Sequence, residues 1–156
     1  MKNTLRFLIC LAAITASAIG ADNTLGTWKL NTAKSNPAGS PSKLTSLTLV
    51  REASGNGVKV TAKGEREDKT KVDVSYVVKY DGKDTAISGS GLAYDTIAVT
   101  QVDANTLTDV RSKKGGMYKG TGRTVVSPDG KTLTLSTQGT GADGKPFSGT
   151  TVYEKQ

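Results

Sequence analysis

KVDVSYVVKYDGK, residues 71–83, is the stretch that decides the fold class of this chain. Every second residue from Val72 to Val78 is apolar or aromatic, and the residues between them are mostly polar. This period of two is typical of a β-strand with one buried face. The Asp-Gly pair that follows is typical of a tight turn between antiparallel strands. The sequence therefore predicts a strand over 72–80 that ends in a hairpin turn.

The same pattern recurs along the chain between Gly26 and Glu154. Short alternating runs rich in Thr and Val are separated by turn residues, chiefly Gly, Asp and Asn. Connections this short join antiparallel neighbours, because a parallel crossover needs a dozen or more residues. The predicted strands are 26–31, 45–53, 58–66, 72–80, 84–89, 96–102, 106–112, 117–126, 131–137 and 147–154.

This order of strands predicts an all-β fold, a single antiparallel up-and-down β-barrel of about 8–10 strands with its first and last strands paired. Closure removes exposed sheet edges and covers the apolar face. A β-sandwich of two sheets is the alternative. Residues 32–43 form the one long connection, and their Pro and Gly residues exclude a continuous helix. We expect this connection to be irregular and to lie over one barrel mouth, with no significant helix elsewhere in 21–156.

Residues 1–20 have the composition of a secretory signal peptide. Lys2 and Arg6 precede an apolar core that is too short to span a bilayer. Small residues follow, so we expect cleavage after Gly20 or after Ala18. The expected organisation is a signal peptide over 1–20 and one β-barrel domain over 21–156, located outside the cytoplasm, in the periplasm or the medium.

The composition of residues 21–156 bears on disulfides, nucleic-acid binding and membrane spans. Cleavage removes Cys10, the only cysteine, so no disulfide is expected. It also lowers the formal net charge from +7 to +5, a modest value that favours solubility over a nucleic-acid partner. No later apolar run is long enough for a membrane span. Nothing in the pattern indicates the oligomeric state.

Catalytic chemistry has few candidate residues here, because the chain contains no histidine. That excludes a Ser-His-Asp triad, a Cys-His pair and a histidine zinc site. Asp-Gly-Lys occurs at 81–83, 129–131 and 143–145, but single Asp residues before Gly indicate turns rather than calcium loops. We therefore expect no enzyme activity, no cofactor and no metal.

The strand pattern also predicts which residues face the barrel interior, since inward and outward positions alternate along each strand. Most are small aliphatics, which would leave a cavity or fill the barrel completely. The polar exceptions are the candidate ligand-binding residues: Asp109, Arg111, Arg123, Tyr76 and Tyr153.

A charged group inside a barrel needs a partner. Asp109 and Arg111 are two apart on one strand face and so could pair, and Arg123 would join them if Met117 and Val125 point inward. Such a cluster would anchor an anionic head group, because Arg offers a fork to a carboxylate. The two tyrosines would then supply hydroxyl donors. The structural alternative is that these charges are solvated strand ends or a surface ion pair.

Two ends of the chain carry a family resemblance. Gly26-Thr27-Trp28-Lys29-Leu30 resembles the opening of lipocalins and of fatty-acid-binding proteins, and Val152-Tyr153-Glu154-Lys155 resembles the last strand of the latter. Thr151 stands where fatty-acid-binding proteins carry an anchoring Arg. The resemblance implies a calycin-like barrel in which Trp28 closes one end.

Nearly the whole of 21–156 resembles a group of small secreted bacterial lipocalin-like proteins that have no established function. The shared motifs are Trp28-Lys29-Leu30-Asn31 with Lys34-Ser35, Lys79-Tyr80-Asp81-Gly82-Lys83, Asp103-Ala104-Asn105-Thr106, Ser127-Pro128-Asp129-Gly130-Lys131 and the Val-Tyr-Glu-Lys ending. We expect a secreted β-barrel that binds a small apolar or amphipathic ligand. If the arginines anchor a head group, this ligand is anionic. The alternative is a structural or protein-interaction module with a filled barrel and no small-molecule ligand.

Overall fold

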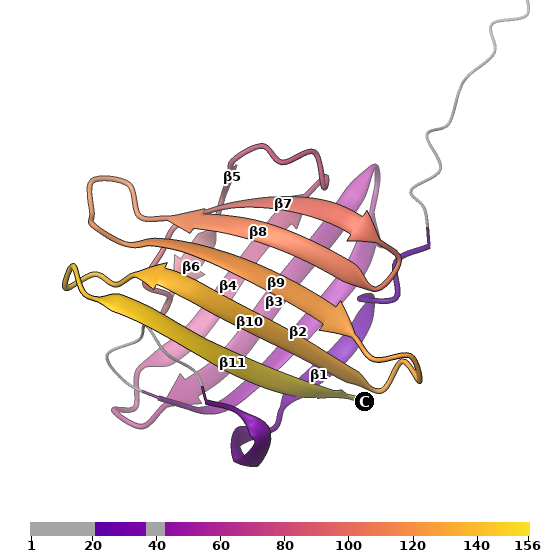
Figure 1. Cartoon of the computed structure of the whole chain (residues 1–156), viewed down its shortest axis with the longest axis horizontal. Helices are drawn as coiled ribbons and strands as arrows, with labels where there is room; N and C mark the ends of the chain where they lie inside the picture. The colour runs from indigo at the N-terminus through magenta and orange to yellow at the C-terminus, as the bar shows by residue number, and fades with distance from the viewer. Residues whose placement is uncertain (1–20, 37–42) are drawn as a thin grey trace, which may run out of the picture.

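The computed structural model describes residues 21–36 and 43–156, so the expected signal peptide and part of the long connection lie outside the described residues. One antiparallel sheet of eleven strands wraps into a nearly closed barrel (Figure 1). The strands are β1 (Gly26–Leu30), β2 (Leu44–Ser54), β3 (Gly57–Arg66), β4 (Lys71–Val78), β5 (Thr85–Ala86), β6 (Ser88–Ser90), β7 (Thr96–Asp103), β8 (Thr106–Ser112), β9 (Lys119–Val126), β10 (Thr132–Thr140) and β11 (Pro146–Lys155).

The order of strands is β5-β7-β8-β9-β10-β11-β1-β2-β3-β4-β6. Strand β1 pairs with both β2 and β11, which confirms the predicted contact between the first and last strands. The barrel is least complete between β4 and β7. There the chain forms two short edge strands, β6 on β4 and β5 on β7, in place of the single strand predicted over 84–89. Ile87 lies between them and packs against the core.

The three Asp-Gly-Lys triplets share a local backbone conformation, but only those at 129–131 and 143–145 belong to a turn closed by a backbone hydrogen bond. The glycines Gly82, Gly130 and Gly144 all have φ between +70° and +77°, a conformation that favours glycine. In each turn the Asp carboxylate accepts a hydrogen bond from the Lys backbone N–H, at 3.0–3.1 Å. The turn at 81–83 does not close a hairpin as predicted, because β4 pairs with β6 and Asp81 instead bridges to Thr100 of β7.

The apolar core forms two clusters inside the barrel. One surrounds Trp28, which is 0% exposed, and includes Tyr153. The other surrounds Val60 and fills the region between β3, β4, β7 and β8. Trp28, expected to close one barrel end, and Tyr153, expected to face the interior, are both buried. They lie on paired strands, because Tyr153 pairs with Leu30 across β1 and β11.

The barrel end beside Trp28 is closed by a polar network that the first described residues complete. The Trp28 indole N–H donates to the carbonyl of Thr24 at 2.8 Å. Buried Arg51 donates to the Thr24 hydroxyl at 3.0 Å and to the Tyr80 hydroxyl at 2.7 Å. Tyr80 in turn donates to the carboxylate of Asp22 at 2.6 Å. These bonds account for the polar groups buried at this end.

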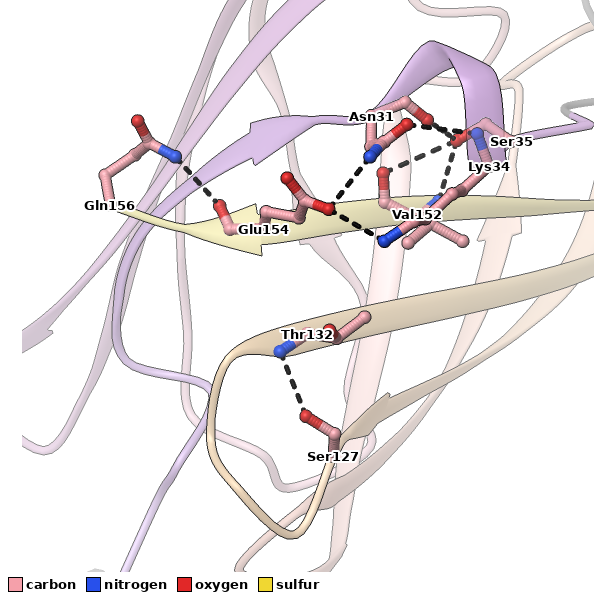
Figure 2. Close-up of polar contacts among 8 residues, drawn as sticks. All are labelled: Asn31, Lys34, Ser35, Ser127, Thr132, Val152, Glu154 and Gln156. Carbon is pink, nitrogen blue, oxygen red and sulfur yellow. Dashed lines mark hydrogen bonds and ion pairs between the residues drawn. The ribbon is translucent and has the colours of Figure 1, made fainter.

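After β1 the chain makes the turn drawn in Figure 2 and continues along the same edge of β11, where Asn36 pairs with Thr150. A single 3-10 turn, η1 (Thr32–Lys34), is tied to Glu154 by Asn31 at 2.8 Å and by Lys34 at 3.0 Å. These donors lower the pKa of the Glu154 carboxyl. The backbone N–H of Val152 donates to the hydroxyl of Ser35 at 2.9 Å. The connection thus contains one short helical turn, where the sequence predicted only irregular chain.

Within 21–36 and 43–156, no helix has the length and apolar character that crossing a membrane requires.

Candidate functional site

The barrel encloses a cavity of about 180 Å³. Its wall is mainly apolar and comes from strands on all sides of the barrel, with Leu47, Leu49, Val74, Ile97, Leu107, Leu133 and Leu135 among its residues. Its polar residues are one carboxylate, four cations, four tyrosines and three threonines: Asp109, Arg51, Arg66, Arg111, Lys43, Tyr76, Tyr94, Tyr118, Tyr153, Thr124, Thr137 and Thr151. A few polar groups within an apolar wall is the usual composition of a small-molecule site.

Asp109 and Arg111 form a buried ion pair inside the cavity. Both lie on β8 and both point inward, and they are only 7% and 8% exposed. The guanidinium Nε donates to Asp109 Oδ1 at 2.5 Å and one terminal nitrogen donates to Oδ2 at 3.0 Å. The pairing predicted from their spacing is therefore found, and it is buried rather than on the surface. Both carboxylate oxygens of Asp109 are occupied by Arg111.

Gly122 provides the space for this ion pair. It lies opposite Asp109 on the neighbouring strand β9. A Cβ atom added at Gly122 would collide with both carboxylate oxygens of Asp109. Glycine is thus required here by the close approach of the carboxylate, although it weakens a strand.

Aromatic rings pack beside the arginine. The Arg111 guanidinium lies 5.1 Å from the centre of the Tyr94 ring, within cation–π range. Tyr94 stacks on Tyr118, and Tyr118 stacks on Phe147, each with 5.5 Å between ring centres. Burial acts to lower the pKa of Arg111, but Tyr94 and the carboxylate of Asp109 raise it by more. The net direction is upward, so Arg111 is charged.

Three phenol hydroxyls face the cavity without a protein partner. Those of Tyr76, Tyr94 and Tyr153 make no hydrogen bond to any other residue within the described ranges, although Tyr153 is only 4% exposed. Burial raises the pKa of all three phenols. They are therefore neutral groups, each of which can donate one hydrogen bond and accept others.

The hydroxyl of Tyr153 has no partner among the described residues, whereas that of Tyr80 bonds to Arg51 and Asp22. A matched pair of Tyr→Phe variants tests this difference. We expect Tyr153→Phe to change the free energy of unfolding by less than about 0.5 kcal/mol, because its hydroxyl bonds to no other described residue. Tyr80→Phe is expected to cost about 1–2 kcal/mol, because it breaks the bonds to Arg51 and Asp22. Urea denaturation followed by circular dichroism measures both values. A cost for Tyr153→Phe equal to that for Tyr80→Phe would contradict the assignment.

Arg123 does not join the ion pair, so the inward orientation expected for it is wrong. It lies on the exposed outer face of β9, opposite Thr108 and Ser136. The expectation took Met117 and Val125 as inward, but both are exposed. The inward positions of β9 are instead Gly120, Gly122, Thr124 and Val126. Two of the four inward positions are glycines, so the apolar side chains of this segment suggested the opposite face.

The remaining predicted site residues, Tyr76, Tyr153, Asp109 and Arg111, all line the cavity. Sequence reasoning missed two aromatic residues of the site. Tyr94 lies in the connection before β7, where no alternation exists to assign it a face. Tyr118 precedes β9 and is buried, and its even numbering, shared with Gly120 and Gly122, is the signal that could have identified it.

Metal-binding chemistry finds no support in the part of the chain that the structure describes. No group of three or more His, Cys, Asp or Glu side chains is placed there to hold an ion. The site offers instead an enclosed apolar volume, one compensated ion pair and neutral hydroxyls.

Comparison with known proteins gives one informative result. No family model and no curated protein matches the chain. Among solved structures, the chain is similar to zebrafish ileal bile acid-binding protein complexed with cholic acid. The TM-score is 0.51, the sequence identity is 16%, and the match covers 86% of this chain and all of the other. At this identity the likeness concerns the fold alone, and it shows that the chain adopts a calycin-like, nearly closed β-barrel.

Proposed function

We propose that this protein is a non-enzymatic β-barrel that binds a small apolar or amphipathic molecule in the barrel interior. The observation that carries the proposal is the set of unpartnered phenol hydroxyls, those of Tyr76, Tyr94 and Tyr153, inside a cavity whose wall is mainly apolar. Within the described residues, no side-chain nitrogen or oxygen that is sealed inside the protein lacks a hydrogen-bond partner, so these hydroxyls open into the cavity. A bound molecule can accept a hydrogen bond from them or donate one to them.

The chemistry of the cavity supports binding rather than catalysis. The chain has no histidine, and the phenols are held neutral by burial. The one carboxylate in the cavity wall, Asp109, is occupied on both oxygens by Arg111. General acid–base catalysis needs a group that exchanges a proton near neutral pH, and these groups are poorly suited to that role.

We propose in addition that residues 1–20 are a signal peptide and that the protein works outside the cytoplasm, in the periplasm or the medium. The support is the composition of that segment and the resemblance of 21–156 to small secreted bacterial lipocalin-like proteins. An extracytoplasmic barrel that carries a small molecule is consistent with the likeness to a bile acid-binding protein, although that likeness is one of fold.

Native mass spectrometry of protein purified from its own extracytoplasmic compartment tests the proposal. We expect a mass excess of one small molecule per chain, lost on denaturation, over a polypeptide that lacks residues 1–20 or 1–18. The excess should disappear in Ala62→Phe, because Ala62 lines the cavity and a larger ring fills it. Circular dichroism checks that this variant folds, since overpacking costs about 1–3 kcal/mol.

The matched control is Ala98→Phe. Ala98 also lies in a strand and is also buried, at 9% exposure, but it lines a separate depression on the outer surface of β7 to β10. This variant should keep the bound mass. If the parent protein carries no small molecule, or if Ala62→Phe keeps it, the interior is not the binding site. The interaction-module alternative, a barrel that acts through its outer face, would then be preferred.

A further inference from the structure

We infer that the polar part of the cavity selects an uncharged hydroxyl or carbonyl group over a carboxylate, so that the ligand is a compact neutral alcohol, phenol or ketone. This inference rests on the proposed binding function and names the class of ligand. It departs from the expectation of an anionic head group, and the reason lies in how the charges of the cavity are paired.

The positive charge of Arg111 is already neutralised. Asp109 accepts two hydrogen bonds from the guanidinium, and its carboxylate packs directly against Gly122, where a side chain would collide with it. An entering carboxylate would either lie beside Asp109, which is a like charge, or displace it. Displacement would leave Asp109 as an unpaired charge within the barrel, and such a charge is strongly destabilising.

Three other cations belong to the cavity wall: Arg51, Arg66 and Lys43. Lys43 is exposed, so its ammonium lies in solvent rather than inside the barrel. Arg51 donates to Thr24 and Tyr80 at the closed end, where Asp22 completes the network. Arg66 donates to the carbonyl of Gly91 at 3.0 Å. Each of these two guanidiniums is therefore bonded to the protein through Nε and one terminal nitrogen, which holds it in place at the cavity wall.

Neutral hydroxyls are the groups left to bind a ligand. Tyr76, Tyr94 and Tyr153 each present a hydroxyl that can donate to a ligand oxygen, and each can accept from a ligand hydroxyl. They match a hydroxyl or carbonyl in both roles. They supply no charge to balance a carboxylate, whose burial without a counter-charge is costly.

The size of the cavity limits the ligand skeleton. A volume of about 180 Å³ is slightly larger than the roughly 150 Å³ that accommodates benzene in a protein core. It is smaller than the 300–1,000 Å³ or so typical of sites for larger ligands. A single ring, two fused rings or a short aliphatic chain fits this volume.

A matched pair of probes tests the inference directly. The probes are 2-naphthol, which is uncharged at pH 7, and 2-naphthoate, which carries a carboxylate on the same skeleton. We expect the parent protein to bind 2-naphthol at least tenfold more tightly, measured by fluorescence titration and by calorimetry. Asp109→Asn uncovers the charge of Arg111 and is expected to abolish or reverse this preference. Arg123→Met, on the outer face, should change neither affinity.

The outcomes separate this inference from the proposed function. Equal or tighter binding of 2-naphthoate by the parent overturns the inference but leaves interior binding standing. Binding of neither probe by the parent counts against both. An unchanged preference in a folded Asp109→Asn overturns the role of the ion pair.

If Asp109→Asn does not fold, the double variant Asp109→Asn/Arg111→Gln replaces it. This variant has neither charge, so it must still prefer 2-naphthol, and equal binding of the two probes would reject the inference.

Discussion

Replacement of Trp28 by alanine is expected to lower the free energy of unfolding by about 3–5 kcal/mol, as truncation of large buried aromatics does. Trp28 is fully buried and packs in one of the two core clusters, beside Val72 and Tyr153. Its indole N–H also satisfies the carbonyl of Thr24, so alanine leaves both a cavity and an unpaired carbonyl. Because Trp28 is the only Trp, circular dichroism rather than fluorescence should follow urea denaturation.

Lys155→Met provides the control for this variant. The Lys155 ammonium lies 5.1 Å from the centre of the Trp28 ring, on the exposed side of the barrel. Removing this cation should cost at most about 1 kcal/mol, the value for an exposed cation–π contact. An unchanged midpoint of unfolding in Trp28→Ala would show that Trp28 does not close the barrel end.

Strand alternation was sufficient to predict most of the fold. The strand predicted over 106–112 matches β8 residue for residue, and from Leu107 onward buried residues alternate with more exposed ones. The prediction over 84–89 failed where the barrel is incompletely closed. There two strands of two or three residues each pair with a different neighbour, and such short segments carry no periodic signal.

The candidate site was predictable only where a single strand contains the interaction. Asp109 and Arg111 are two apart on β8, so their pairing follows from local geometry. Their surroundings depend on tertiary structure: Tyr94 comes from a connection, and Gly122 comes from the next strand. The misplacement of Arg123 has the same origin, since the face of β9 is set by its pairing with β8 and not by its own composition.

The ion pair itself gives the second large effect. Asp109→Ala is expected to destabilise the protein by about 3–5 kcal/mol, because it leaves the charge of Arg111 buried without its carboxylate. The contact with the Tyr94 ring remains but cannot replace an anion. Asp109→Asn should cost less, because an amide oxygen still accepts a hydrogen bond from the guanidinium. Urea denaturation of each variant gives these values.

A double variant shows whether the cost comes from the unpaired charge. Asp109→Leu/Arg111→Met replaces both groups by apolar side chains of similar volume, and such replacements of buried pairs are often neutral or stabilising. We therefore expect the double variant to be more stable than Asp109→Ala and close to the parent.

If the double variant is as unstable as Asp109→Ala, the pair contributes through packing and not through charge. If Asp109→Ala costs less than about 1 kcal/mol, water reaches Arg111 and the cavity is more polar than its apolar wall indicates. The selectivity inferred for neutral ligands requires that Asp109→Ala is strongly destabilised and that the double variant is close to the parent. Only an ion pair shielded from water excludes a carboxylate from this site.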